Sequence, residues 1–134
     1  MGALDQTFSN SVLDATFDRS GASVRLSTGP MHCRYMTANG SATANGTELA
    51  TGSGYTSGTG APTFTTAAAS AGSEASNSAI TTTNMPATTI VGVEVWDSAG
   101  TPARKYWGAL TANKTTNLGD TFTIASGSLT AALT

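Results

Sequence analysis

The segment of residues 84–110 constrains the fold more than any other, because it holds both tryptophans, three of the five valines and a tyrosine. The other long stretches of the chain consist mostly of Thr, Ser, Ala and Gly. Its pattern predicts two β-strands, 89–96 and 102–110, joined by a turn at Asp97-Ser98-Ala99-Gly100. We expect the remaining strands to pack on this hairpin, because little else could nucleate a core.

The stock of large apolar side chains is small. Leu, Ile, Val and Phe make up 20 of the 134 residues. The net charge is only -2 and charged residues are 10% of the chain, so charge repulsion does not favour disorder. Ordering the backbone nevertheless costs about 1–2 kcal/mol per residue. We therefore expect the chain to gain stability by burying surface against copies of itself or another protein.

Charge and cysteine content argue against several classes of function. The few basic residues are scattered, so we expect no phosphate-binding face and no direct nucleic-acid contact. One cysteine, Cys33, cannot form an internal disulfide. The N-terminus MGALDQTF lacks the basic and apolar regions of a signal peptide. No apolar run approaches the roughly 20 residues of a membrane span. We expect a soluble protein made in a cytoplasm, without a membrane partner.

The hydrophobic periodicity of residues 3–18 predicts an N-terminal α-helix that ends at Ser20-Gly21. Its apolar stripe comprises Leu4, Phe8, Val12, Leu13 and Phe17. Such a stripe packs either against the rest of its own domain or against a neighbouring subunit. We name Leu4, Phe8, Leu13 and Phe17 as candidate partner contacts.

The remainder of the sequence is typical of an all-β protein. The expected strands outside the central hairpin are 22–26, 31–37, 62–70, 77–83, 121–125 and 128–133, with the last two joined by a turn at Ser126-Gly127. Residues 38–61 contain six glycines and predict a long surface loop, with Leu49 and Tyr55 as further candidate partner contacts. The fold predicted is one domain over residues 1–134, an antiparallel β-sandwich or jelly roll with one N-terminal α-helix and a core in 62–133.

Catalytic patterns are weak. His32 and Cys33 are adjacent, so a strand would point them to opposite faces, and one His with one Cys does not make a zinc site. A serine triad built on His32 stays open, although no G-x-S-x-G motif is present. Glu94 and Asp97 flank Trp96 and could act as paired carboxylates on a sugar. We favour a structural interpretation, in which Glu94 faces solvent or pairs with a basic residue across the hairpin and Asp97 opens the turn.

The aromatic residues of the hairpin allow two interpretations. Trp96, Tyr106 and Trp107 could form a platform for a sugar, or they could hold the sandwich together as core aromatics. We favour core aromatics. The glycine-rich segments match neither a dinucleotide-binding nor a phosphate-loop motif. We expect no enzyme activity, no metal and no cofactor.

A series of ordered motifs occupies the second half of the chain. They are N-S-A-I from Asn77, N-M-P-A-T-T-I-V-G-V-E-V-W-D from Asn84, Y-W-G-A-L-T-A-N-K-T from Tyr106 and L-G-D-T-F-T-I-A-S-G-S-L-T from Leu118. In this order they resemble a family of small structural proteins of tailed bacteriophages. The resemblance covers most of the chain and is strongest over 77–133. Such proteins are commonly labelled tail-fibre or minor structural proteins, so the resemblance implies a virion component.

From these observations we expect a non-enzymatic virion protein, assembled in the cytoplasm of the bacterial host. The favoured role is decoration of the capsid, as a small homo-oligomer, preferably a trimer, bound to the lattice of the major capsid protein. Many copies of a modest interface would then stabilise the shell. The alternatives are a tail or tail-fibre component bound to tail proteins, and a carbohydrate-binding module. Copy number per particle separates capsid from tail.

Overall fold

The computed structural model describes residues 3–16 and 29–132. It begins with a short strand, β1 (Ala3–Leu4), and a helix, α1 (Gln6–Thr16). The helix starts after Asp5, whose Oδ1 accepts hydrogen bonds from the backbone N–H groups of Thr7 (2.9 Å) and Phe8 (3.4 Å). Asp5 is thus an N-cap, and the expected helix start at residue 3 was too early. The expected helix end at Ser20-Gly21 and the expected strand 22–26 lie outside the described residues.

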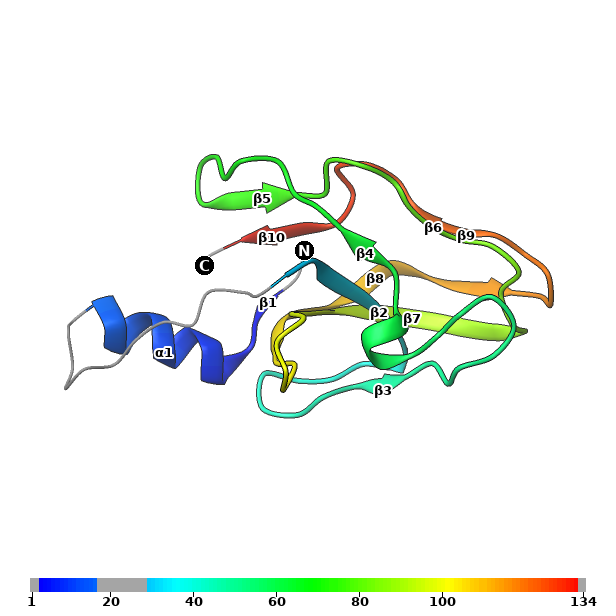
Figure 1. Cartoon of the computed structure of the whole chain (residues 1–134), viewed down its shortest axis with the longest axis horizontal. Helices are drawn as coiled ribbons and strands as arrows, with labels where there is room; N and C mark the ends of the chain where they lie inside the picture. The colour runs from blue at the N-terminus through cyan, green and yellow to red at the C-terminus, as the bar shows by residue number, and fades with distance from the viewer. Residues whose placement is uncertain (1–2, 17–28, 133–134) are drawn as a thin grey trace.

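A six-stranded antiparallel sheet forms the larger layer (Figure 1). Its strand order is β1-β8-β7-β2-β3, and β4 also pairs with β2. The bounds are β2 Met31–Ala38, β3 Thr47–Glu48, β4 Thr63–Phe64, β7 Thr88–Trp96 and β8 Arg104–Thr116. The predicted central hairpin is confirmed by the β7–β8 pairing. β8 runs further than expected, because pairing resumes beyond an irregularity opposite Ile90 and Gly92.

Two short ladders form the second layer over one face of this sheet (Figure 1). β5 (Ser73–Ala75) pairs with β10 (Thr130–Ala132), and β6 (Ile80–Thr82) pairs with β9 (Phe122–Ile124). The turn at Ser126-Gly127 does not make a hairpin of 121–125 and 128–133, because each of these segments pairs with a strand of the 73–82 region instead. Within the described residues the chain is all-β with one α-helix, arranged as a sandwich, as predicted.

The core lies between the layers and centres on Tyr35. The Tyr35 ring stacks on the Tyr55 ring, with centroids 5.0 Å apart. It also forms a T-shaped contact with the Phe122 ring, with centroids 4.9 Å apart. The Tyr35 hydroxyl hydrogen-bonds Thr82 Oγ1 at 2.8 Å, which ties β2 to β6. The other members are Cys33, Leu49, Ala61, Phe64, Ile80, Met85, Ile90, Val93 and Val95.

The 38–61 segment is more structured than expected. It contains β3 and a short 3-10 helix, η1 (Gly58–Gly60), and it contributes Leu49 and Tyr55 to the core. The Gly54 N–H donates to the Asn84 carbonyl at 2.7 Å, and a Cβ on Gly54 would overlap the Thr83 carbonyl oxygen. Glycine therefore lets the segment lie close against the chain between β6 and β7.

Core burial predicts loss of stability at alkaline pH. Burial raises the pKa of the Cys33 thiol from its ordinary 9.0 to about 12, and burial also raises the pKa values of the Tyr35 and Tyr55 hydroxyls. The unfolded chain ionises these groups first, so stability is complete below pH 9 and is lost as pH rises towards 12. We expect Cys33 alone to cost on the order of 2 kcal/mol between about pH 8 and 10.5.

Urea unfolding at the two pH values measures this loss. A Cys33→Ala variant should lose less stability over the same interval, because it has no thiol to ionise. Parallel pH dependence of the two proteins would contradict the assignment to Cys33.

Candidate interaction surface

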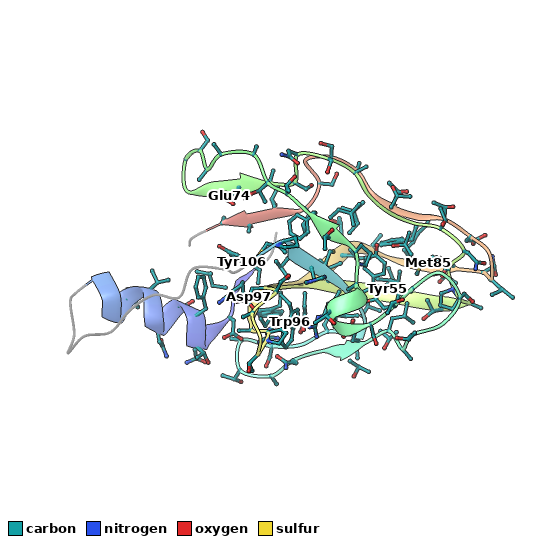
Figure 2. All side chains as sticks on the ribbon, in the orientation of Figure 1. Tyr55, Glu74, Met85, Trp96, Asp97 and Tyr106 are labelled. Atoms are coloured by element: carbon teal, nitrogen blue, oxygen red, sulfur yellow. The ribbon has the colours of Figure 1, made fainter. Side chains whose placement is uncertain are left out.

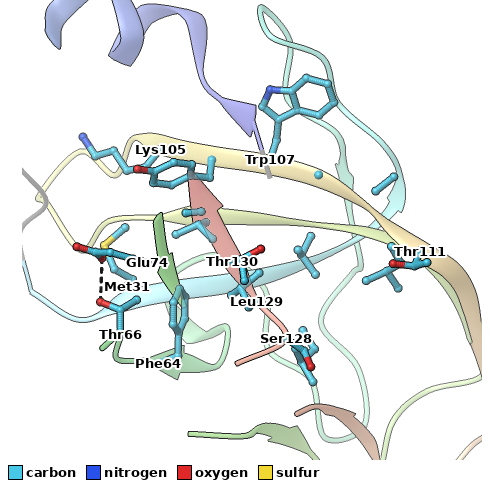
Figure 3. A pocket seen from close by; sticks show the side chains of 18 of the residues that line it. Met31, Phe64, Thr66, Glu74, Lys105, Trp107, Thr111, Ser128, Leu129 and Thr130 are labelled. Atoms are coloured by element: carbon cyan, nitrogen blue, oxygen red, sulfur yellow. Dashed lines mark hydrogen bonds between the residues drawn. The ribbon is translucent and has the colours of Figure 1, made fainter. Parts of the chain in front are cut away.

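A groove of about 360 Å³ opens between the six-stranded sheet and the β5–β10 ladder (Figure 3). At its polar side, Thr66 Oγ1 donates to Glu74 Oε2 at 3.0 Å. Lys105 also lines it. The apolar lining includes Met31, Phe64, Tyr106, Leu110, Ile124 and Leu129.

The groove exists because one layer carries side chains too small to fill it. β7 presents Val93 and Val95 to the interior, whereas β5 reads Ser-Glu-Ala and β10 reads Thr-Ala-Ala. Tyr106 is consequently only half-buried; burial raises the pKa of its hydroxyl, and the charge of Glu74 raises it further. The shortage of large side chains noted in the sequence thus appears as an unfilled apolar surface, which a second chain could cover.

The opposite face of the main sheet carries a buried polar cluster around Arg104. All five guanidinium N–H donors are used: Nε and Nη2 donate to Asp5 Oδ2 at 3.1 and 2.7 Å, and Nη1 donates to Glu94 Oε1 at 2.9 Å. Nη1 and Nη2 also donate to the carbonyls of Ala44 (2.8 Å) and Ser41 (2.6 Å). One side chain therefore fastens the start of α1 and the 41–44 loop to the centre of the sheet.

The two hairpin carboxylates have structural partners. Glu94 Oε1 accepts from the Gly46 N–H at 2.7 Å, and Oε2 accepts from Trp96 Nε1 at 3.0 Å. Asp97 Oδ1 accepts from the Ala103 N–H at 2.8 Å, which closes the turn. Burial opposes ionisation of Asp97, but that hydrogen bond and the nearby Lys105 charge outweigh it and lower the pKa of the carboxyl. Of the two expectations for Glu94, exposure to solvent is wrong, because the residue is almost completely buried. Pairing with a basic residue across the hairpin is confirmed, and that residue is Arg104.

A serine does meet the single histidine. His32 Nε2 lies 2.9 Å from Ser98 Oγ, and His32 Nδ1 lies 2.9 Å from the Ala61 carbonyl oxygen. The third position of a triad, normally a carboxylate, is thus a neutral carbonyl. Ser98 Oγ also donates to the Pro30 carbonyl at 2.5 Å. This network ties the β7–β8 turn to the start of β2. Cys33 points to the other face of the strand and is fully buried.

The predicted partner contacts separate into different environments. Leu49 and Tyr55 are buried in the core, so they offer no surface to a partner. Leu4 lies in β1 opposite Tyr106 and is half-buried. Two further predicted contact residues, Phe8 and Leu13, lie on α1. Phe8 is half-buried and lines the groove, whereas Leu13 is 57% exposed. Phe17 lies outside the described residues.

The three hairpin aromatics do not share one face. Tyr106 packs against the core and lines the groove, whereas Trp96 lies on the polar side beneath Arg34. Trp107 pairs with Glu94 across the hairpin and has a buried Nε1 without a hydrogen-bond partner. Neither tryptophan belongs to the central core cluster, whose aromatic members come instead from β2, β4, β9 and the 38–61 segment.

No group of three His, Cys, Asp or Glu side chains placed to hold a metal ion occurs in residues 3–16 and 29–132. In the same ranges no helix is long and apolar enough to cross a membrane. The sequence matches the family model described as podophage GP4 fiber I protein gp80 over residues 3–132, and the chain belongs to this family. It is therefore a phage structural protein and a component of the virion. A comparison with curated proteins gave no match.

Proposed function

We propose that the chain is a subunit of a podophage tail fibre and that it works by assembling with copies of itself, with a trimer favoured. The family name supports the fibre assignment over capsid decoration. The role is structural, because the charged side chains nearest the hairpin serve to hold segments of the chain together. The observation that carries self-association is the groove, whose apolar walls are left partly uncovered.

The helix adds a second surface for assembly. Figure 1 shows α1 extending sideways from the sandwich, beyond the sheets. Its exposed Leu13 (57% exposed) and half-buried Val12 are apolar. Burying such surface on a neighbouring copy yields about 25 cal/mol per Å², and symmetry repeats the gain in each interface.

Location in the particle separates the fibre from capsid decoration, the role expected from the sequence. Immunogold labelling of purified virions and quantitative mass spectrometry of copy number provide the test. A fibre subunit should label only the tail region, with few copies per particle. Labelling spread over the shell, with hundreds of copies, would contradict the fibre assignment and support binding to the major capsid protein.

A charged substitution in the groove should weaken self-association. Leu110 lines the groove, and Leu110→Lys would place an ammonium against its apolar wall. We expect the association constant to fall by at least about tenfold, equivalent to about 1.4 kcal/mol. Sedimentation velocity across a concentration series measures it, and a melting curve checks that the variant is folded.

The matched control is Leu118→Lys. Leu118 is 72% exposed in the turn before β9 and does not line the groove. Equal losses in both variants, or no loss in Leu110→Lys, would show that the groove is not the contact.

A further inference from the structure

A second cleft, of about 460 Å³, lies where the start of α1, the loop around residues 43–45 and the β7–β8 turn meet. Phe8 and Lys105 line both this cleft and the groove, and so stand between them. Figure 2 shows Trp96 and Asp97 beside the turn, on the side where α1 begins. The remaining polar lining includes Thr43, Asn45 and Thr101.

The Trp96 ring is held rigidly. Its Nε1 donates to Glu94 Oε2 at 3.0 Å, and the Arg34 guanidinium lies 4.1 Å from the ring centroid. Arg34 is itself ion-paired with Glu48 at 3.4 Å. Because the guanidinium covers one face, a ligand in the cleft can meet the indole only on its other face or at its edge. Such a fixed aromatic surface loses little conformational entropy when it binds.

The charges that line the cleft cancel. Arg104 pairs with Asp5 at 2.7 Å, and Lys105 pairs with Asp97 at 3.4 Å. The cleft therefore offers neither a net positive nor a net negative site. Arg34 behind the indole further disfavours a cationic ligand on the ring, because the ring already makes a cation–π contact with the Arg34 guanidinium. Thr43, Asn45 and Thr101 can both donate and accept hydrogen bonds.

We propose that this cleft binds a neutral saccharide, with the C–H face of a sugar ring against Trp96 and its hydroxyls bonded to Thr43, Asn45 and Thr101. A neutral sugar ring has an apolar C–H face and carries no charge. The hydroxyl groups around its rim donate and accept hydrogen bonds. Those properties match the rigid indole, the neutral polar side chains and the cancelled charges. Saccharide binding in this cleft does not depend on where the chain sits in the virion.

Amide and indole NMR spectra of the full chain provide the test. The probes are the methyl glycosides of glucose, galactose, mannose and N-acetylglucosamine, titrated to millimolar concentrations. With at least one probe, we expect saturable shifts of the Trp96 indole N–H and of the backbone amides of residues 43–45. The Trp107 indole, which does not line this cleft, should stay in place.

Asn45→Arg blocks the cleft at an exposed loop position and should weaken binding by at least about tenfold. Asn113→Arg makes the same change at an exposed position on β8 outside the cleft, and should bind as the parent does. The proposal is overturned if no glycoside gives a saturable shift, or if Asn45→Arg binds unchanged. It is also overturned if tetramethylammonium, methyl phosphate or phenol shifts the Trp96 signal more than every sugar.

Discussion

Replacing Arg104 with alanine is expected to lower the free energy of unfolding by about 3–5 kcal/mol. The guanidinium side chain is 3% exposed and Glu94 is 2% exposed, so the variant would leave a buried carboxylate without its counter-charge. It would also leave the Ser41 and Ala44 carbonyls and one oxygen of Asp5 without their donors. Small domains are stable by only about 5–15 kcal/mol, so this loss can abolish folding near 37 °C. Urea denaturation followed by tryptophan fluorescence measures it.

Two variants make this prediction specific. Lys114→Ala removes an exposed cation from the same strand and should change stability by less than about 0.5 kcal/mol. Arg104→Lys keeps the charge but has three donors in place of five and no planar fork. It should fall between the parent and Arg104→Ala. If Arg104→Lys matched the parent, charge alone would account for the cluster and the five-donor geometry would be irrelevant.

The sequence predicted part of this cluster for a physical reason. The turn at Asp97 brings Glu94 and Arg104 together across one hairpin, and cross-strand pairing follows from alternation. Asp5 lies 99 residues from Arg104, and Ala44 lies 60 residues away. No periodicity in the chain encodes such pairs, because they depend on how separate elements dock. The start of the helix could have been found from the sequence, because aspartate is a favourable N-cap residue and Asp5 comes directly before the helix.

The core likewise depends on contacts between separate elements, which the sequence pattern does not predict. Strands with a strong pattern, such as 89–96, were predicted, whereas the partners of 121–125 and 128–133 were not. Both segments have clear alternation, but alternation does not say which strand lies beside another. Tyr55 was assigned to the surface because its neighbours are glycine and threonine. The groove likewise depends on small side chains of one layer facing large ones of the other, a relation that no single stretch of sequence contains.

Truncating the residue at the centre of that core should have an effect of similar size. Tyr35 is 0% exposed, stacks on Tyr55 and meets Phe122. Tyr35→Ala is expected to cost about 3–5 kcal/mol, because it loses the transfer free energy of the ring and leaves a cavity. With so few other large apolar side chains available to move in, collapse around the cavity is limited. We expect the upper part of that range.

Tyr35→Phe separates packing from hydrogen bonding. It keeps the stack but leaves the buried Thr82 hydroxyl without its 2.8 Å partner, at a cost of about 1–3 kcal/mol. Urea midpoints of the parent and both variants, measured at neutral pH, give the two contributions by difference. Packing of the ring contributes more than its hydroxyl if the alanine variant is clearly the less stable of the two. Equal losses would mean instead that the hydroxyl link between β2 and β6, rather than the aromatic cluster, holds the two layers together.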